Sequence, residues 1–258
     1  MRTTAFCLLI AASALAADLE LNLRTRIQVF KTGDEWQEVQ LRKTFAPRES
    51  AILICDMWDN HWCKGAALRV NGLADKMDPV LKRARAKGIL IIHAPSDVTD
   101  FYADSPQRSA MLALQKIDPP AQREIVDGPF PIDDKKGGCD THEGFYKAWT
   151  RENARLHIAP EDVISDKGPE IYSLLRLRGI KNLFIMGVHT NMCVLNRSFA
   201  IKQMTKWGVN CVLVRDLTDS MYDPETRPFV SHDQGTELVI QHIERYWCPT
   251  VLSADLAR

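Results

Sequence analysis

The chain contains the run Leu183-Phe-Ile-Met-Gly-Val-His-Thr-Asn-Met-Cys193-Val194. Its first four residues are apolar and lead into Gly187, a pattern typical of a buried strand in a parallel sheet. From Val194 onward apolar residues recur with helical spacing as far as Gly208, so we expect a helix there. Cys193 would then lie in the first turn of a helix, beyond the carboxyl end of a strand, where open α/β sheets bind ligands. The positive helix end would lower the pKa of its thiol and could hold a developing oxyanion.

Short apolar runs and helical patterns alternate along the rest of the chain. Strands are expected at 51–55, 89–92, 162–165, 183–186, 210–214 and 251–252, and helices near 73–84, 105–117, 169–177, 194–208 and 235–247. This order predicts a three-layer αβα fold with a doubly wound, mostly parallel sheet. Residues 97–160 are irregular, and a segment this long is typical of a functional or covering element. Alternating residues on both sides of Thr32-Gly33-Asp34 predict an N-terminal β-hairpin.

The first residues have the pattern of an export signal. Arg2 precedes an apolar stretch that ends in Ala14-Leu-Ala16, an A-x-A cleavage site. We therefore expect residues 1–17 to be a signal peptide and the mature protein to be exported, to the periplasm or the medium, without a membrane span. Residues 18–47 would form the hairpin extension, 48–252 a single α/β domain and 253–258 a tail.

Charge and cysteine content exclude several classes of protein. The 33 basic residues balance 33 acidic ones, so no basic face for nucleic acid is expected. The seven cysteines show no CxxC pair and no zinc spacing, and we expect neither a metal nor another cofactor. Export permits a disulfide. The sequence does not choose its partners, for which the candidates are Cys63, Cys139 and Cys248.

Polar residues follow several of the predicted strands. Parallel strands bring their carboxyl ends to one edge of a sheet, so Asp56, Lys167 and Cys193 could converge. Asp56 would take the thiol proton and return it to a leaving group, while Lys167 would hold the carboxylate and favour the thiolate. Cys193 would attack a carbonyl carbon. The alternative readings are a salt-bridging aspartate, a solvated lysine and a core cysteine.

These motifs resemble the isochorismatase-like family of cysteine hydrolases, which includes the nicotinamidases. The family's first-strand motif looks like Ile52-Leu-Ile-Cys-Asp-Met57, and its Gly-Val-x-Thr-x-x-Cys-Val motif is matched by Gly187-Val-His-Thr-Asn-Met-Cys-Val194. The resemblance covers about residues 48–252, which it implies to be a hydrolase domain with a six-stranded parallel sheet. It also implies a cis peptide between Val188 and His189 and a triad of Asp56, Lys167 and Cys193.

The chain departs from the family's pattern in two places near the triad. Trp58 stands where the family usually has Gln. After Lys167 the family usually shows a Ser-Ala-Phe-like segment, whereas here Gly168-Pro169 starts the next helix at once. Should Lys167 point away, the cation could come from the irregular segment, which offers Lys135, Lys136 and Lys147.

A further departure concerns metal binding. Nicotinamidase-type relatives bind a metal through Asp-x-His after the second strand, where this chain reads His93-Ala-Pro-Ser-Asp97. The pair Asp59-x-His61 has that spacing but follows the first strand. The resemblance therefore does not change the expectation that no metal is bound.

Cys193 is absent from the family's true isochorismate hydrolases, so its presence favours attack on an acyl or amide carbon. We predict an exported hydrolase that cleaves a C–N bond of a small amide through an acyl-thioester. A carbamoyl or ester substrate is a second possibility, and an inactive member that binds a small molecule or a partner is a third. The family also implies a homo-oligomer. Substrate contacts are expected from Trp58, His93, His189, Thr190 and Asn191, with His61 and Tyr222 as further candidates.

Overall fold

The computed structural model describes residues 17–258, so the predicted signal peptide lies, apart from Ala17, outside the described residues. The strands are β1 (Leu19–Gln28), β2 (Trp36–Phe45), β3 (Ser50–Cys55), β4 (Leu90–Ala94), β5 (Val163–Ile164), β6 (Asn182–Val188), β7 (Asn210–Asp219) and β8 (Thr250–Val251). The α-helices are α1 (Lys64–Ala86), α2 (Pro106–Leu112), α3 (Gly168–Leu177), α4 (Cys193–Asn196), α5 (Ile201–Lys206), α6 (His232–Tyr246) and α7 (Ser253–Leu256). Two short 3-10 helices are η1 (Pro47–Glu49) and η2 (Thr99–Tyr102).

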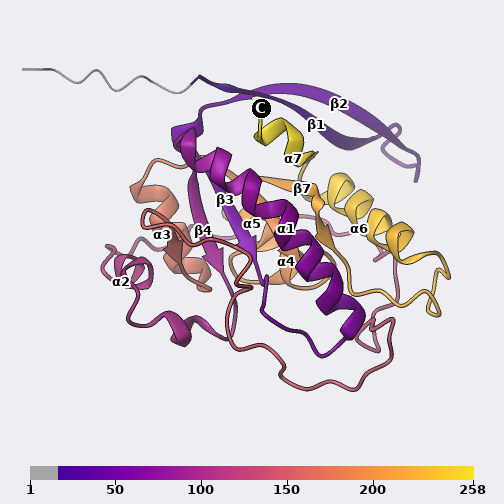
Figure 1. Cartoon of the computed structure of the whole chain (residues 1–258). Helices are drawn as coiled ribbons and strands as arrows, with labels where there is room; N and C mark the ends of the chain where they lie inside the picture. The colour runs from indigo at the N-terminus through magenta and orange to yellow at the C-terminus, as the bar shows by residue number, and fades with distance from the viewer. Residues whose placement is uncertain (1–16) are drawn as a thin grey trace, which may run out of the picture.

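All eight strands belong to one sheet with the order β2-β1-β8-β7-β6-β3-β4-β5 (Figure 1). The strands from β3 to β8 pair in parallel, and β1 joins antiparallel to both β2 and β8. The predicted six-stranded parallel sheet with an N-terminal hairpin is thus confirmed. From β3 the chain proceeds to β4 and β5 on one side and then returns to β6 on the other. The crevice between the carboxyl ends of β3 and β6 is therefore the topological switch point, where such sheets bind ligands.

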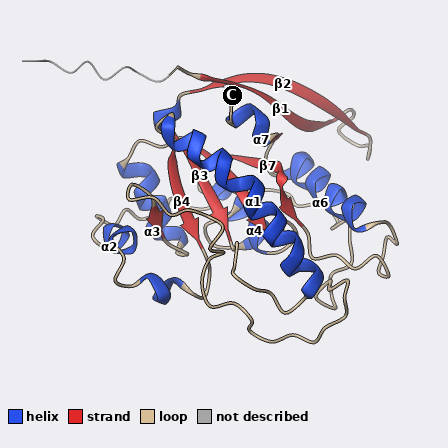
Figure 2. Ribbon diagram, viewed as in Figure 1, coloured by secondary structure: helices blue, strands red, loops and turns tan. Residues whose placement is uncertain are grey.

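Helices cover both faces of the sheet, which explains the continuous apolar runs of its central strands (Figure 2). Leu53 and Cys55 of β3 face a core cluster shared with α3, α4, α5 and α6. Ile52 and Ile54 face the opposite cluster, shared with α1, α7 and the hairpin. The predicted C-terminal tail includes α7, whose Leu256 is fully buried in that second cluster.

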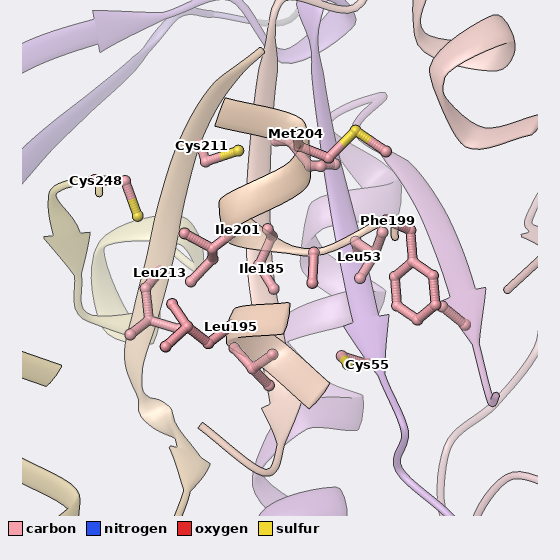
Figure 3. Close-up of a cluster of buried hydrophobic side chains, with 14 of the residues drawn as sticks. Leu53, Cys55, Ile185, Leu195, Phe199, Ile201, Met204, Cys211, Leu213 and Cys248 are labelled. Carbon is pink, nitrogen blue, oxygen red and sulfur yellow. The ribbon is translucent and has the colours of Figure 1, made fainter. Parts of the chain in front are cut away.

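The single helix predicted at 194–208 is instead two helices. The backbone leaves the helical conformation at Arg197, with φ −59° and ψ 154°, and α5 starts at Ile201. Figure 3 shows Phe199, in the turn between the two helices, packed in the core beside β3. The turn is held by the start of α3: a Cβ on Gly168 would lie 2.0 Å from the carbonyl oxygen of Ser198, so the two backbones are in direct contact. Packing thus overrides the helical pattern.

The irregular segment crosses the carboxyl end of the sheet, beneath the arrowheads of β3 and β4 in Figure 1. α2 ends at Leu112 rather than near 117, and no further helix or strand of this segment precedes β5. A Cys63–Cys139 disulfide and a β-bridge between Trp58 and Glu152 attach the segment to the loop after β3. Of the disulfide candidates left open by the sequence, Cys248 is free. No helix within residues 17–258 is long and apolar enough to span a bilayer.

Candidate active site

Asp56 lies at the carboxyl end of β3 and has no exposed surface. Its backbone has a positive φ of 48°, which turns the chain sharply out of the strand. The Asp56 N–H donates to the carbonyl of Ala94 on the neighbouring strand, over 3.1 Å. In return the backbone N–H of Ser96 donates to Asp56 Oδ1 over 2.7 Å. Asp56 is therefore fixed both by its own strand, β3, and by the end of the neighbouring β4, and its carboxylate is surrounded by protein groups.

Cys193 opens α4, just beyond β6, and its side chain is partly exposed. Because β6 pairs directly with β3, the thiol lies beside the Asp56 carboxylate, close enough for each group to shift the pKa of the other. This close approach needs Gly187, whose φ is +115° and where a Cβ would lie 2.0 Å from the carbonyl oxygen of Cys55. The structure thus brings together two of the three residues of the predicted triad.

The cation beside this pair is Arg197. Its Nε donates to Asp56 Oδ2 over 3.1 Å, and its Nη2 donates to Asp97 Oδ2 over 3.2 Å. The guanidinium also lies close enough to the Cys193 sulfur to lower the pKa of the thiol. Sequence reasoning missed Arg197, although a usable signal was present: it follows Cys193 by four positions, the spacing at which helical side chains share a face.

Lys167, expected to complete the triad, is not in contact with Asp56. Its Nζ pairs with Asp166 Oδ1 at 3.0 Å, and its side chain is 59% exposed. The reason is local. Lys167 is the N-cap residue of α3, and the helix begins at once with the tightly packed Gly168. The connection between β5 and α3 is therefore too short to bring the Lys167 side chain inward. Of the alternatives, Lys135 and Lys136 are exposed, and Lys147 donates to the backbone carbonyl of Asp97 over 3.1 Å.

The electrostatics of the pair differ from the expectation for a cysteine at a helix N-terminus. Burial and the neighbouring Asp56 raise the pKa of the Cys193 thiol well above its usual value, and Arg197 only partly opposes them. Burial also raises the pKa of Asp56, against the charge of Arg197 and the hydrogen bonds from Cys193 and Ser96. The predicted lowering of the thiol pKa is therefore wrong. The four residues of α4 contribute too little dipole to outweigh desolvation.

The oxyanion donors that we expected are only partly available. The backbone N–H of Met192 donates to the carbonyl of His189 over 3.0 Å. Within residues 17–258, the backbone N–H of Cys193 donates to no protein acceptor. It points from the same turn as the sulfur, so it is the group that could bind a developing oxyanion. Beside it lies an open hollow of about 350 Å³, lined by Asp134, Asn191, Met192, Cys193, Asn196 and Arg197.

His93, predicted to contact substrate, is a structural residue. It is completely buried, with Nδ1 2.7 Å from Glu152 Oε2 and Nε2 3.1 Å from Asp162 Oδ2. Burial alone would lower its pKa, but the two carboxylates overcome this and raise the pKa to about 9. Both ring nitrogens are engaged in this network, so the ring has no polar atom to offer a ligand.

Trp58, also predicted to contact substrate, is connected to the Asp56 carboxylate through Ser96. Its Nε1 donates to the carbonyl of Ser96 over 3.0 Å, and Ser96 carries the N–H that binds Asp56. The indole stacks on Trp149, with ring centroids 4.3 Å apart and planes 9° from parallel. Trp149 belongs to the irregular segment, so the stack also fixes that segment above the loop after β3.

The residues between β6 and α4 have different roles. The Val188–His189 peptide is cis, as the family resemblance implies. His189 is 2% exposed, its Nε2 is without a hydrogen-bond partner, and burial lowers its pKa to about 3. Thr190 bonds the hydroxyl of Thr218, and Asn191 bonds both the N–H and the carbonyl of Met221. Thr190 and Asn191 therefore anchor the loop.

The remaining candidates are held by protein groups. Asp59 accepts from the N–H and the hydroxyl of Thr150, and His61 Nδ1 accepts from the N–H of Cys63. The pair with metal-site spacing is thus divided between two local networks. Tyr222 is fully buried and donates its hydroxyl to the carbonyl of Thr226.

Comparison with known proteins identifies the family. No protein-family model matches the chain, so the assignment depends on individual relatives. The fold is that of a cysteine hydrolase from Pseudomonas syringae pv. phaseolicola 1448A, with a TM-score of 0.56, 17% identity, and coverage of 83% of this chain and 93% of that one. In sequence, the chain is 30% identical over 173 residues to ureidoacrylate amidohydrolase RutB of Enterobacter sp. (strain 638), covering 58% of this chain and 68% of the relative. The chain belongs to the isochorismatase-like cysteine hydrolase family.

Other relatives match this isochorismatase-like protein over a similar region. The RutB of Klebsiella variicola (strain At-22) is 27% identical over 164 residues, which are 58% of this chain and 66% of the relative. The chain thus spans slightly less than two thirds of that relative. The match supports the family but leaves the activity and the substrate to be proposed from the site.

Proposed function

We propose that this protein is a cysteine hydrolase that cleaves a C–N bond of a small amide, with Cys193 as the nucleophile and Asp56 as the acid and base. The observation that carries the proposal is the placement of the Cys193 thiol beside a fully buried Asp56 carboxylate at the switch point of the sheet. A nucleophile beside its base is the arrangement that covalent catalysis requires.

The reaction follows from the positions of the two groups. Asp56 accepts the thiol proton as the Cys193 sulfur bonds to the carbonyl carbon, and the carbonyl oxygen takes the negative charge beside the Cys193 N–H. The C–N bond then breaks as Asp56 returns the proton to the leaving nitrogen. A water molecule attacks the thioester while Asp56 takes its proton, and the C–S bond breaks to restore the thiol. The raised pKa of Asp56 brings it closer to neutrality, which suits both transfers.

The substrate class is also a proposal. The relatives are named ureidoacrylate amidohydrolases, which supports a substrate with an amide or ureido C–N bond. The hollow beside Cys193 is small and lined mostly by polar side chains. We therefore propose a small polar amide or ureido compound. A carbamoyl or ester leaving group remains the alternative that a substrate panel distinguishes by its products.

The decisive experiment is detection of the acyl-enzyme. The protein is incubated with a mixture of small amides and ureido compounds, and its intact mass is measured together with ammonia release. We expect an adduct on the wild type that is absent from Cys193→Ala, and turnover lost by at least about 10³-fold. Cys211→Ala is the matched control, because Cys211 is also free but is buried at the core face of β7. Equal ammonia release by Cys193→Ala would reject Cys193 as the nucleophile, and no release by either protein would favour a binding protein without this chemistry.

We also propose that the protein is exported. The Cys63–Cys139 disulfide supports this location, because such bonds persist in oxidising compartments and are rare in the cytosol. N-terminal sequencing of protein from the native host should give a chain that starts near Ala17 or Asp18. An intact Met1 would contradict export. The homo-oligomer stays a prediction, which light scattering can check.

A further inference from the structure

We propose that Arg197 is the catalytic cation of this site, in the role that the family resemblance assigns to a lysine at Lys167. This inference rests on the proposed cysteine chemistry and names the third member of its reacting group. Arg197 acts on both reacting partners, because its guanidinium donates to the Asp56 carboxylate over 3.1 Å and lies four residues after Cys193, close enough to lower the pKa of the thiol.

The position of Lys167 argues against its taking this role by a change of rotamer alone. Its partner Asp166 is 8% exposed and also accepts from the N–H of Asp97 over 3.2 Å, so the lysine binds an anion on the outside of the β4–β5 edge. The next residue, Gly168, touches the backbone of Ser198 and donates its N–H to the Ser198 hydroxyl over 3.1 Å. Moving Lys167 inward would require this packed contact to break.

The same contact places Arg197. The N–H of Arg197 still donates to the carbonyl of Cys193 over 3.0 Å, so the residue completes one helical turn from the nucleophile. The backbone then turns out of the helix, and Phe199 fills the core two residues later (Figure 3). Ser198, between them, is held by Gly168. The short connection before α3 and the break between α4 and α5 therefore meet in the Gly168–Ser198 contact. This contact fixes the backbone position from which the Arg197 side chain extends.

The charges around the guanidinium suit a permanent cation. It faces Asp56 after β3, Asp97 after β4 and Cys193 in α4, and Asp134 of the irregular segment lines the same hollow. Asp56 raises the already high pKa of Arg197 further, although burial opposes this. An arginine keeps its charge at every working pH and does not act as a proton donor. Asp56 is then the single proton carrier of the triad, and Arg197 makes the thiolate accessible by lowering the pKa of Cys193.

The test measures the cysteine directly and needs no substrate. Alkylation of Cys193 by iodoacetamide is followed by mass spectrometry from pH 6 to 10 in the wild type, Arg197→Ala, Arg197→Lys and Lys167→Ala, with folding checked by thermal unfolding. Arg197→Ala should slow alkylation at pH 7.5 by about 10-fold or more, since loss of the cation raises the thiol pKa. Lys167→Ala should stay within about twofold of the wild type. Arg197→Lys should recover part of the rate throughout this range, because an ammonium beside the Asp56 carboxylate stays protonated below pH 10.

The outcomes separate this inference from the proposed function. If Arg197→Ala alkylates as fast as the wild type, or if Lys167→Ala is the slow variant, Arg197 is not the cation. If the wild type shows the expected pattern but forms no acyl adduct with any amide, the cation is assigned correctly and the hydrolase proposal fails. A merely structural Arg197 would lower the unfolding temperature of both Arg197 variants and leave the pH profile of alkylation where it is in the wild type, and that result would also overturn the inference.

Discussion

Trp58 donates its indole N–H to the backbone carbonyl of Ser96 over 3.0 Å. The same Ser96 residue donates its backbone N–H to Asp56 Oδ1 over 2.7 Å. The tryptophan that stands where the family usually has a glutamine is therefore connected to the Asp56 carboxylate through a single residue, Ser96.

Trp58→Phe should reduce kcat while leaving KM almost unchanged. The phenyl ring keeps most of the stacking on Trp149 but cannot donate to Ser96, so the loop loses the hydrogen bond that orients its N–H toward Asp56. We expect kcat to fall about 5-fold, because a lost hydrogen bond is typically worth about 1 kcal/mol. Trp62→Phe is the matched control, since Trp62 lies in the same loop and packs beside the disulfide. A rise in KM with unchanged kcat would instead make Trp58 a substrate contact.

Asp56→Asn should separate thiol reactivity from turnover. The negative charge of Asp56 raises the pKa of Cys193, so its removal beside an intact Arg197 should lower that pKa and speed alkylation at neutral pH. Amide hydrolysis should nevertheless fall by about 10²–10⁴-fold, because no group remains to carry the proton. Parallel measurements of iodoacetamide alkylation and ammonia release check this. Slower alkylation in the variant would show that Asp56 does not oppose thiolate formation.

His93 should make the stability of the protein depend on pH on the alkaline side. Its pKa in the folded protein, about 9, lies above its ordinary value of 6.5, so the protonated ring stabilises the fold fully below pH 6.5. That contribution is lost as the pH rises through 9. His93→Gln should lower the free energy of unfolding by about 3–5 kcal/mol at pH 6, because the buried carboxylates of Glu152 and Asp162 lose their shared cation. Urea unfolding at pH 6 and pH 10 measures it.

The exposed His157 provides the control for this experiment. His157→Gln should change the free energy of unfolding by less than about 0.5 kcal/mol at either pH. The wild type could exceed His93→Gln in free energy of unfolding by as much at pH 10 as at pH 6. That result would mean that packing of the His93 ring, rather than its charge, holds the network.

The Cys63–Cys139 bond should govern how firmly the irregular segment covers the site. The bond spans a sequence separation of 76 residues, and replacing both cysteines by serine should cost about 2–5 kcal/mol of unfolding free energy. The segment should also become the first site of limited proteolysis. Dithiothreitol should reproduce both effects in the wild type and add nothing to the double serine variant. Unchanged proteolysis after reduction would show that the other contacts, among them the Trp58–Trp149 stack and the Trp58–Glu152 bridge, are sufficient to fix the segment.

Much of the fold follows from local pattern in the sequence. The central strands are buried on both faces, so their apolar runs are continuous, and glycines end the predicted helices near the observed positions. The motif from Gly187 to Val194 located Cys193 correctly at the start of a helix. Asp56 could be paired with it because neighbouring parallel strands end at the same edge.

The parts that local pattern did not predict depend on contacts between distant segments. The break at Arg197 is set by Gly168, about thirty positions earlier in the chain, and nothing in the helical periodicity of 194–208 reports that contact. His93 was assigned to the substrate because it follows a strand, but its partners Glu152 and Asp162 come from the irregular segment and the start of β5. A pattern that lacks these long-range neighbours cannot separate a buried ion pair from a ligand contact.

The hairpin shields what would be an open border of the molecule. β8 has only two residues, and β1 pairs with it through Arg24 and Thr250. Arg24 and Arg26 of β1 also neutralise Glu244, whose carboxylate is completely shielded from water. A shortened protein that begins at Ser50 would keep Asp56, Cys193 and Arg197. It would, however, leave the buried carboxylate of Glu244 without its two arginines and the edge of β8 without a neighbouring strand. Minimal versions for screening or crystallisation should therefore retain the chain from Asp18 onward.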